Sequence, residues 1–107
     1  MSGGFRMSKY ESKLKNAEND SLFSAILQLE NIEECYRFFQ DVLTIPELKS
    51  ITQRWEVALL LSKGMTYTEI AKELGVSTAT ICRVNKALAY GEGGYKLILE
   101  RLGKDGN

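Results

Sequence analysis

Residues 66–89 constrain the fold of this chain more than any other segment. Thr66 stands three residues before Glu69, which is the capping-box pattern for the start of a helix. Gly75 permits the positive φ that ends a helix in a tight turn, and Ser77 is a typical N-cap for a second helix. Apolar residues recur at helical spacing through the segment: Ile70, Ala71, Leu74, Val76, Ile81, Val84 and Leu88. The segment therefore predicts two short helices packed across a tight turn.

This pattern is typical of the helix-turn-helix, whose second helix enters the major groove of DNA. Ala71 is small where the second helix crosses close to the first, and Gly75 turns the chain without a Cβ clash. Because several such requirements are met together, we predict a helix-turn-helix; a generic αα-hairpin without DNA binding is the alternative.

The second helix of this motif would present a DNA-binding face. The side chains expected there are Ser77, Thr78, Ala79, Thr80, Cys82, Arg83 and Lys86. Hydroxyls suit phosphates or base edges, an alanine suits a thymine methyl group, and cations suit phosphates. A solvated helix face explains each residue taken singly, but their shared position favours DNA.

Two helices are predicted before residue 44 and one after residue 90. Asn19 or Asp20 caps the first, and Asn31 caps the second. The Gly-rich stretch 90–94 is expected to be a flexible break, and residues 103–107 a frayed end. The apolar stripes are Leu22, Phe23, Ile26, Leu27 and Leu29, then Ile32, Cys35, Tyr36, Phe39, Val42 and Leu43, and finally Tyr95, Ile98, Leu99 and Leu102. No segment alternates with period two, so the sequence predicts an all-α fold.

A long helix is predicted from Thr44 onward. Thr44 and Glu47 form a capping box, Pro46 lies in the first turn where its missing N–H costs nothing, and Gly64 is the expected left-handed stop. Residues 57–61 are apolar on every face, so this half of the helix must be covered on all sides. Interlocking with a second chain would supply that cover; a central core helix in a monomer is the alternative.

Composition excludes several classes of protein. The 107 residues suit one domain, and 14 basic residues balance 14 acidic ones, which excludes a uniformly basic nucleic-acid coat. The neutral total hides an asymmetry, because residues 21–50 carry five acids against two bases and residues 65–90 carry three bases against two acids. The chain has no histidine, no Gly-rich phosphate loop and no paired carboxylates at a plausible site, so we expect no enzyme activity, metal site or cofactor.

Cys35 and Cys82 are too far apart for a CxxC motif, and we expect both thiols to be buried or half-buried. The sequence shows no disulfide framework, no apolar signal segment and no apolar run long enough for a membrane span. We therefore expect a cytoplasmic protein.

Residues 1–18 are polar and are predicted to form a flexible N-terminal arm, with a plain disordered terminus as the alternative. The arm carries Lys9, Lys13 and Lys15, and the sequence leaves open whether residues before Met7 are native. Residues 19–107 would form the helical domain.

Several short stretches between residues 43 and 88 together form a pattern that is specific enough to compare with known families. They are Leu43-Thr44, Gln53-Arg54, Lys63-Gly64-Met65, Glu69-Ile70, Lys72-Glu73-Leu74-Gly75 and Ala79-Thr80-Ile81-Cys82-Arg83. This set resembles the Trp repressor family, and with the tail at residues 90–95 it resembles the uncharacterised YerC/YecD group of that family. The resemblance covers less than half of the chain strongly. It implies an intertwined all-helical homodimer whose helix-turn-helix units read successive major grooves.

The resemblance also implies an effector site. In the family, two arginines sandwich an indole ring, and the matching residues here are Arg54 and Arg83. Two threonines of the family pocket match Thr44 and Thr80. A family glycine is replaced by Val84, and a serine that binds the amino group of the ligand is replaced by Ala87. A small-molecule effector other than tryptophan, or none, is therefore expected; the arginines could equally pair with acids or DNA phosphates.

Two positions that contact DNA in the family also differ. A basic residue of the first motif helix is replaced by Thr68, and an isoleucine that opens the second helix is replaced by Thr78. A different operator is expected.

We interpret the sequence as a homodimeric transcriptional regulator, acting as a repressor, that binds double-stranded DNA sequence-specifically. The alternative is a protein-interaction or assembly module with the same fold that does not read DNA. The acidic N-terminal half favours this alternative slightly. Only the transcriptional regulator is expected to show a salt-dependent affinity for DNA, because phosphate contacts release counterions. The sequence does not define the operator, the regulated genes or the effector, and it does not distinguish a repressor from an activator.

Overall fold

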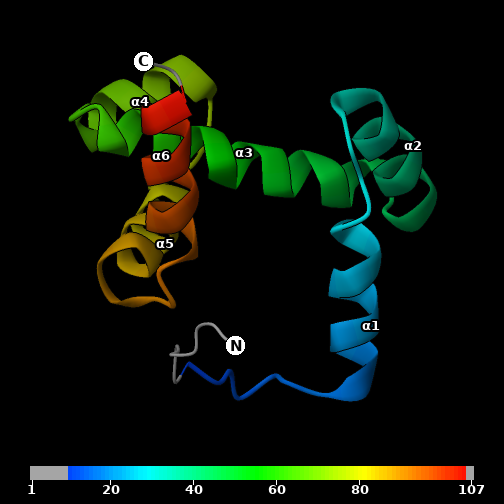
Figure 1. Cartoon of the computed structure of the whole chain (residues 1–107). Helices are drawn as coiled ribbons and strands as arrows, with labels where there is room; N and C mark the ends of the chain where they lie inside the picture. Colours follow the sequence, from blue (N-terminus) through cyan, green and yellow to red (C-terminus); the bar gives the residue numbers. More distant parts are fainter. Residues whose placement is uncertain (1–9, 106–107) are drawn as a thin grey trace. The chain divides into compact units, whose positions relative to one another are not determined.

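The computed structural model describes residues 10–105, which contain six α-helices and no strand (Figure 1). The helices are α1 (Ala17–Ile26), α2 (Ile32–Val42), α3 (Ile45–Ser62), α4 (Tyr67–Leu74), α5 (Thr78–Tyr90) and α6 (Gly94–Asp105). The all-α prediction is confirmed. The chain divides into two compact units, Met1–Asp41 and Val42–Asn107, which we call the N-terminal and C-terminal units.

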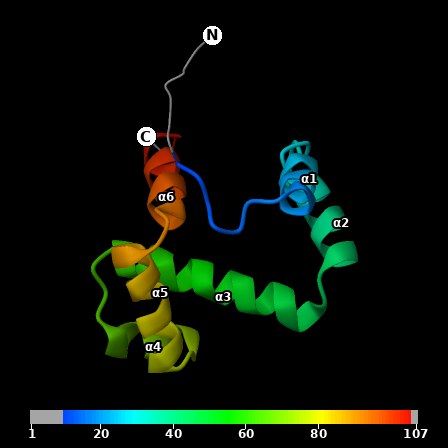
Figure 2. The ribbon, with the colours of Figure 1, turned by 90° about the horizontal axis from the view of Figure 1, so that it is seen from below.

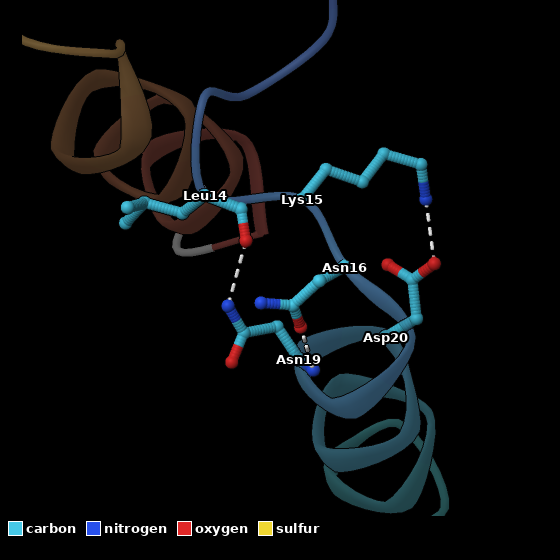
Figure 3. Close-up of polar contacts among 5 residues, drawn as sticks. All are labelled: Leu14, Lys15, Asn16, Asn19 and Asp20. Atoms are coloured by element: carbon cyan, nitrogen blue, oxygen red, sulfur yellow. Dashed lines mark hydrogen bonds and ion pairs between the residues drawn. The ribbon is translucent and has the colours of Figure 1, made fainter.

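Helix α1 begins directly after Asn16, whose side-chain oxygen accepts the N–H of Asn19 at 2.7 Å. The prediction of a cap at Asn19 or Asp20 is wrong, because both side chains reach back instead (Figure 3). Asn19 donates its side-chain amide to the carbonyl of Leu14 at 2.7 Å, and Asp20 pairs with Lys15 at 2.6 Å. These contacts tie the residues before the helix to its first turn.

Residues 1–9 of the predicted arm, with Met7 and Lys9, lie outside the described residues. The flexibility of the arm and its boundary at residue 18 stay predictions.

The predicted cap at Asn31 is confirmed, since its side-chain oxygen accepts the N–H of Glu34 at 2.9 Å. Arg37 forms an ion pair with Glu33 at 2.7 Å on the polar face of α2. Most of the apolar face of the same helix is exposed, although Phe39 on it is half-buried. Cys35 is exposed, so the prediction that this thiol is buried or half-buried is wrong.

No residue of α1 or α2 is buried. The exposed large apolar side chains of this part of the chain are Leu22, Phe23, Leu27, Ile32, Tyr36 and Val42. Ile26, Leu29 and Phe39 of the predicted apolar stripes are half-buried, so the periodicity that predicts these helices corresponds to partial burial and to no fully buried side chain.

Helix α3 starts at the predicted capping box. The backbone N–H of Thr44 donates to Glu47 Oε1 at 2.8 Å, and the N–H of Glu47 donates to Thr44 Oγ1 at 3.2 Å. The helix ends at Ser62, and Gly64 has a φ of 85°, as expected for the predicted stop. Helices α4, α5 and α6 gather around the C-terminal half of α3 (Figures 1 and 2).

The buried core lies where α3, α4 and α5 pack together. Its buried side chains are Val57, Ala58, Ile70, Val76, Ile81 and Val84. Leu60, Leu61, Leu74 and Leu88 pack against this core and are half-buried. The apolar run at residues 57–61 is thus covered on one side within the chain and only partly on the other.

Helix α6 follows a turn that depends on Gly91. A Cβ at Gly91 would collide with the backbone carbonyl oxygen of Ala87, so only glycine fits this close approach. The predicted break at residues 90–94 is confirmed only for residues 91–93, because Tyr90 ends α5 and Gly94 begins α6, and its flexibility stays a prediction. The frayed end is wrong for residues 103–105, which continue α6. Gly106 and Asn107 lie outside the described residues. Within residues 10–105, no helix is long and apolar enough to span a membrane.

Candidate DNA-binding face

Helices α4 and α5 are joined by a three-residue turn, as the helix-turn-helix pattern predicts. Gly75 adopts a φ of 67°, in the left-handed region that L side chains rarely occupy. Val76 is buried under the turn, and Ser77 caps α5 by accepting the N–H of Thr80 at 3.2 Å. Ile70 and Ile81 are fully buried where the two helices meet α3. This packing fixes which face of α5 remains exposed.

The capping box of α4 has an electrostatic consequence. The backbone N–H of Thr66 donates to Glu69 Oε1 at 2.8 Å, and the Glu69 N–H donates back to Thr66 Oγ1 at 3.2 Å. The hydrogen bond from the Thr66 backbone, followed by that with its side chain, lowers the pKa of Glu69 from its ordinary value. The carboxylate therefore satisfies the backbone at the start of α4, where a negative charge is favourable.

The structure leaves most of the predicted DNA-facing side chains exposed. Thr68 on α4 and Ser77, Thr78, Ala79, Cys82, Arg83 and Lys86 are exposed, whereas Thr80 is half-buried. The expectation that Cys82 is buried or half-buried is wrong, because it lies on the outer face of α5, away from the core formed by Ile81 and Val84. The hydroxyl oxygens of Ser77 and Thr80 lie 3.1 Å apart, so the cap of α5 already uses both.

A groove of about 540 Å³ runs along this exposed face. Four predicted residues line it: Ala79, Cys82, Arg83 and Lys86. Four other lining residues were not predicted from the sequence: Tyr67, Asn85, Ala89 and Tyr90. Tyr90 follows Lys86 by four residues and Arg83 by seven, so helical spacing could have placed it on this face. Tyr67 comes from α4, and nothing in its sequence position indicates that it reaches α5.

The two cations of the groove are not neutralised by carboxylates. The ion pairs between described residues are Lys15–Asp20 and Arg37–Glu33, both in the N-terminal unit. Arg83 and Lys86 belong to neither pair, and none of the side chains that line the groove is acidic. The face is therefore a local positive surface on a chain without net charge.

The predicted effector residues are divided among different tasks. Thr44 caps α3 with its hydroxyl, and Thr80 takes part in the cap of α5. Arg54 on α3 and Arg83 on α5 are both exposed, and Arg54 does not line the groove that Arg83 lines. Val84, which replaces the family glycine, is 1 % exposed and belongs to the core.

A separate apolar cavity of about 490 Å³ lies between α3, α5 and α6. Trp55 and Tyr95 stack on its wall, with ring centroids 6.4 Å apart and planes 12° from parallel. Ala87, which replaces the family serine, also lines it. Within the described chain, no group of His, Cys, Asp and Glu side chains is placed to hold a metal ion.

The fold and this face define a class: a small all-helical protein with a helix-turn-helix unit. The family model for the Trp repressor protein matches residues 17–103, and the chain belongs to this family. It is 51% identical over 90 residues to the uncharacterized protein YerC of Bacillus subtilis (strain 168), covering 84% of this chain and 86% of that protein. It is also similar to the crystal structure of a TrpR like protein from Eubacterium eligens, with 52% identity and a TM-score of 0.81 over 85% of this chain and 94% of that one. The predicted resemblance to the Trp repressor family and its YerC group is confirmed.

Proposed function

We propose that this protein is a homodimeric transcriptional regulator that binds double-stranded DNA through α4 and α5 and represses transcription. The observation that carries the proposal is the exposed face of α5, where Arg83 and Lys86 lie unpaired beside the exposed first turn at Thr78 and Ala79. Cations without acidic partners supply phosphate contacts, and short side chains at the start of a recognition helix reach base edges. A regulator that acts on DNA would work in the cytoplasm of a bacterial cell.

The dimer is supported by the uncovered apolar side chains of the N-terminal unit. Leu27 is 81% exposed and Ile32 is 75% exposed, and neither is isolated, because Phe23 and Tyr36 are exposed on the same two helices. Contiguous apolar surface of this kind marks a protein interface. Two copies related by a two-fold axis would present two copies of α5, and we expect them to read half-sites about one helical turn apart, roughly 34–36 Å.

Tryptophan is not expected to be a strong corepressor. The family glycine that leaves room for an indole ring is replaced by Val84, whose side chain is buried in the core. Ala87 has no hydroxyl for the ammonium group of an amino acid. An effector of different shape, bound with help from Arg54 or Arg83, is compatible with this proposal. Calorimetric titration with L-tryptophan, with and without DNA, tests the point: tight binding coupled to tighter DNA affinity would contradict it.

The proposal is tested by selecting duplexes from a random pool and measuring their dissociation constants at several salt concentrations. We expect Lys86→Ala to weaken binding to all sequences and to reduce the salt slope by about one unit. Thr78→Ala should instead change the preferred sequence. Lys96→Ala is the matched control, because Lys96 is an exposed lysine of α6 that lines neither the groove beside α5 nor the apolar cavity.

Two outcomes would count against the proposal. If the parent protein shows no salt-dependent affinity for any duplex, the alternative of a protein-interaction module with this fold is favoured. If the parent binds DNA but both Lys86→Ala and Thr78→Ala bind as the parent does, another surface carries the binding.

A further inference from the structure

We infer that the groove between α4 and α5 binds a phosphate of the DNA backbone. The hydroxyls of Tyr67 and Tyr90 donate hydrogen bonds to this phosphate beside Arg83 and Lys86. This inference rests on the proposed function and deepens it, since it assigns two tyrosines to the DNA-binding surface and gives them a chemical role.

The lining of the groove selects an anion. Arg83 and Lys86 supply two positive charges, Tyr67 and Tyr90 supply neutral O–H donors, and Asn85 supplies an amide. No carboxylate lines the groove, so nothing in its wall would repel a phosphate or compete for the donors. An arginine fork and a lysine ammonium are the side chains that most often hold phosphate oxygens.

The donors of the groove are free to take a ligand. None of the hydrogen bonds or ion pairs found among residues 10–105 engages the side chains of Tyr67, Arg83, Lys86 or Tyr90. Tyr90 is 86% exposed, and Tyr67 is half-buried with its ring packed against the core. The packing of Tyr67 against the core restricts its ring before a ligand binds, whereas the Tyr90 side chain is largely exposed.

The position of the groove favours DNA over a free anion. Ala79 lies in the first turn of α5, which the proposed function places at the DNA, and it lines the same groove as Tyr90 at the last turn. A second groove of about 480 Å³ shares Arg83, Lys86 and Tyr90, so these three side chains form a ridge with an opening on each flank. A ridge of this kind suits a polymer that runs past it, whereas a small anion is usually held in an enclosed site.

Tyr67→Phe and Tyr90→Phe test the inference, because each removes one hydroxyl and keeps the ring. We expect each to raise the dissociation constant for duplex DNA about two- to tenfold. The factor should be the same for specific and non-specific sequences, since a backbone contact carries no sequence information. The salt slope should not change, because no charge is lost, whereas Lys86→Ala lowers it by about one unit. Tyr95→Phe on α6 is the control for loss of a tyrosine hydroxyl, because Tyr95 lines the separate apolar cavity and not this groove.

The outcomes separate this inference from the proposed function. If the parent and Lys86→Ala behave as proposed but both tyrosine variants bind like the parent, the inference fails and the function stands. If a tyrosine variant loses affinity only for the specific sequence, the hydroxyl reads a base and the phosphate assignment is wrong. If the parent binds no duplex, both fail.

Titration with inorganic phosphate distinguishes the two sources of the anion. We expect nuclear magnetic resonance signals of Lys86 and Tyr90 to move on adding a short duplex and to stay unchanged with sub-millimolar phosphate. Saturable shifts with free phosphate at that concentration, unaffected by DNA, would show a free-anion site and overturn the assignment to the DNA backbone. Unchanged circular dichroism of the two variants would show that the effects come from the lost hydroxyls.

Discussion

The two units of this chain use the same kind of sequence pattern with opposite results. In the C-terminal unit, the apolar stripes of α3, α4 and α5 meet one another and bury Val57, Ile70 and Ile81 completely. In the N-terminal unit, α1 and α2 have equally regular stripes, yet neither helix buries a residue. Helical periodicity therefore says that a face will be covered, but it does not say which chain will cover it.

This difference separates the parts that each unit plays in the proposed function. The C-terminal unit builds a core of its own, and this core fixes the exposed face of α5. The N-terminal unit has its apolar surface free for a second copy. Stability within one chain and association between chains should therefore respond to different substitutions.

The largest effect is expected from Ile70→Ala in the C-terminal core. Ile70 is 0% exposed, so the substitution removes buried methyl groups and leaves a cavity. We expect the free energy of unfolding to fall by about 2–5 kcal/mol, measured by urea denaturation. Leu22→Ala is the comparison in α1, where the side chain is 41% exposed. At low protein concentration it should lower the free energy of unfolding clearly less than Ile70→Ala does. Equal losses would show that side chains of the two units contribute equally to a buried core.

The second effect concerns association rather than folding. Ile32→Lys places a charge on the apolar face of α2, and an unpaired charge is costly to bury in an interface. We expect the dissociation constant of the dimer to rise about tenfold or more, equivalent to ~1.4 kcal/mol, measured by sedimentation equilibrium.

Asp41→Lys is the control for that measurement, since Asp41 lies on the polar side of the same helix and is exposed. It should leave the dimer intact. A parent protein that stays at its monomer mass of 12.0 kDa at micromolar concentration would contradict the role given to the N-terminal unit.

A smaller effect is expected at the turn between α4 and α5. Gly75 has a φ of 67°, and an alanine there would strain the backbone although no atom lies within 4 Å of the new Cβ. We expect Gly75→Ala to cost about 1–2 kcal/mol in thermal or urea unfolding.

Gly103→Ala supplies the matched comparison within α6. Gly103 is helical and also has open space around its Cβ position. Alanine is the better helix former, so this variant should be more stable than the parent by about 0.5–1 kcal/mol. A loss of stability at both positions would show that the backbone angle at Gly75 is not the cause.

The smallest expected effect is a pH dependence of stability that differs between the two units. Hydrogen bonds from Thr44 and Thr66 lower the pKa of Glu47 and Glu69 from the ordinary 4.5, and both boxes lie in the C-terminal unit. Their stabilisation is fully present above pH 4.5 and is lost as the pH falls through the lowered values.

In the N-terminal unit, hydrogen bonding and attraction to Asp20 raise the pKa of Lys15 above 10.5. That stabilisation is present below pH 10.5 and is lost as the pH rises through the raised value. We expect hydrogen exchange to become faster at the first turns of α3 and α4 in acid. At the first turn of α1, it should become faster in alkali. Glu69→Gln should weaken the acid response of α4 only; an unchanged response would show that its capping carboxylate does not matter.

The sequence by itself determined the elements whose physical cause is local. The caps at Asn31, Thr44, Thr66 and Ser77 join residues three positions apart, and the left-handed turn at Gly75 depends on one residue type. The cap of α1 was predicted wrongly because Asn16, Asn19 and Asp20 are all suitable N-caps within one turn. Only the contacts of their side chains with Leu14 and Lys15 decide among them.

The tertiary structure alone decided what depends on residues far apart in the sequence. It placed Tyr67 of α4 in one groove with Tyr90 of α5, and it turned Cys82 outward because Ile81 and Val84 take the core side of the helix. It also left most of the apolar face of α2 exposed, including Cys35. A helical stripe records the chemistry of a surface, whereas burial depends on the position of a partner surface, which no local pattern contains.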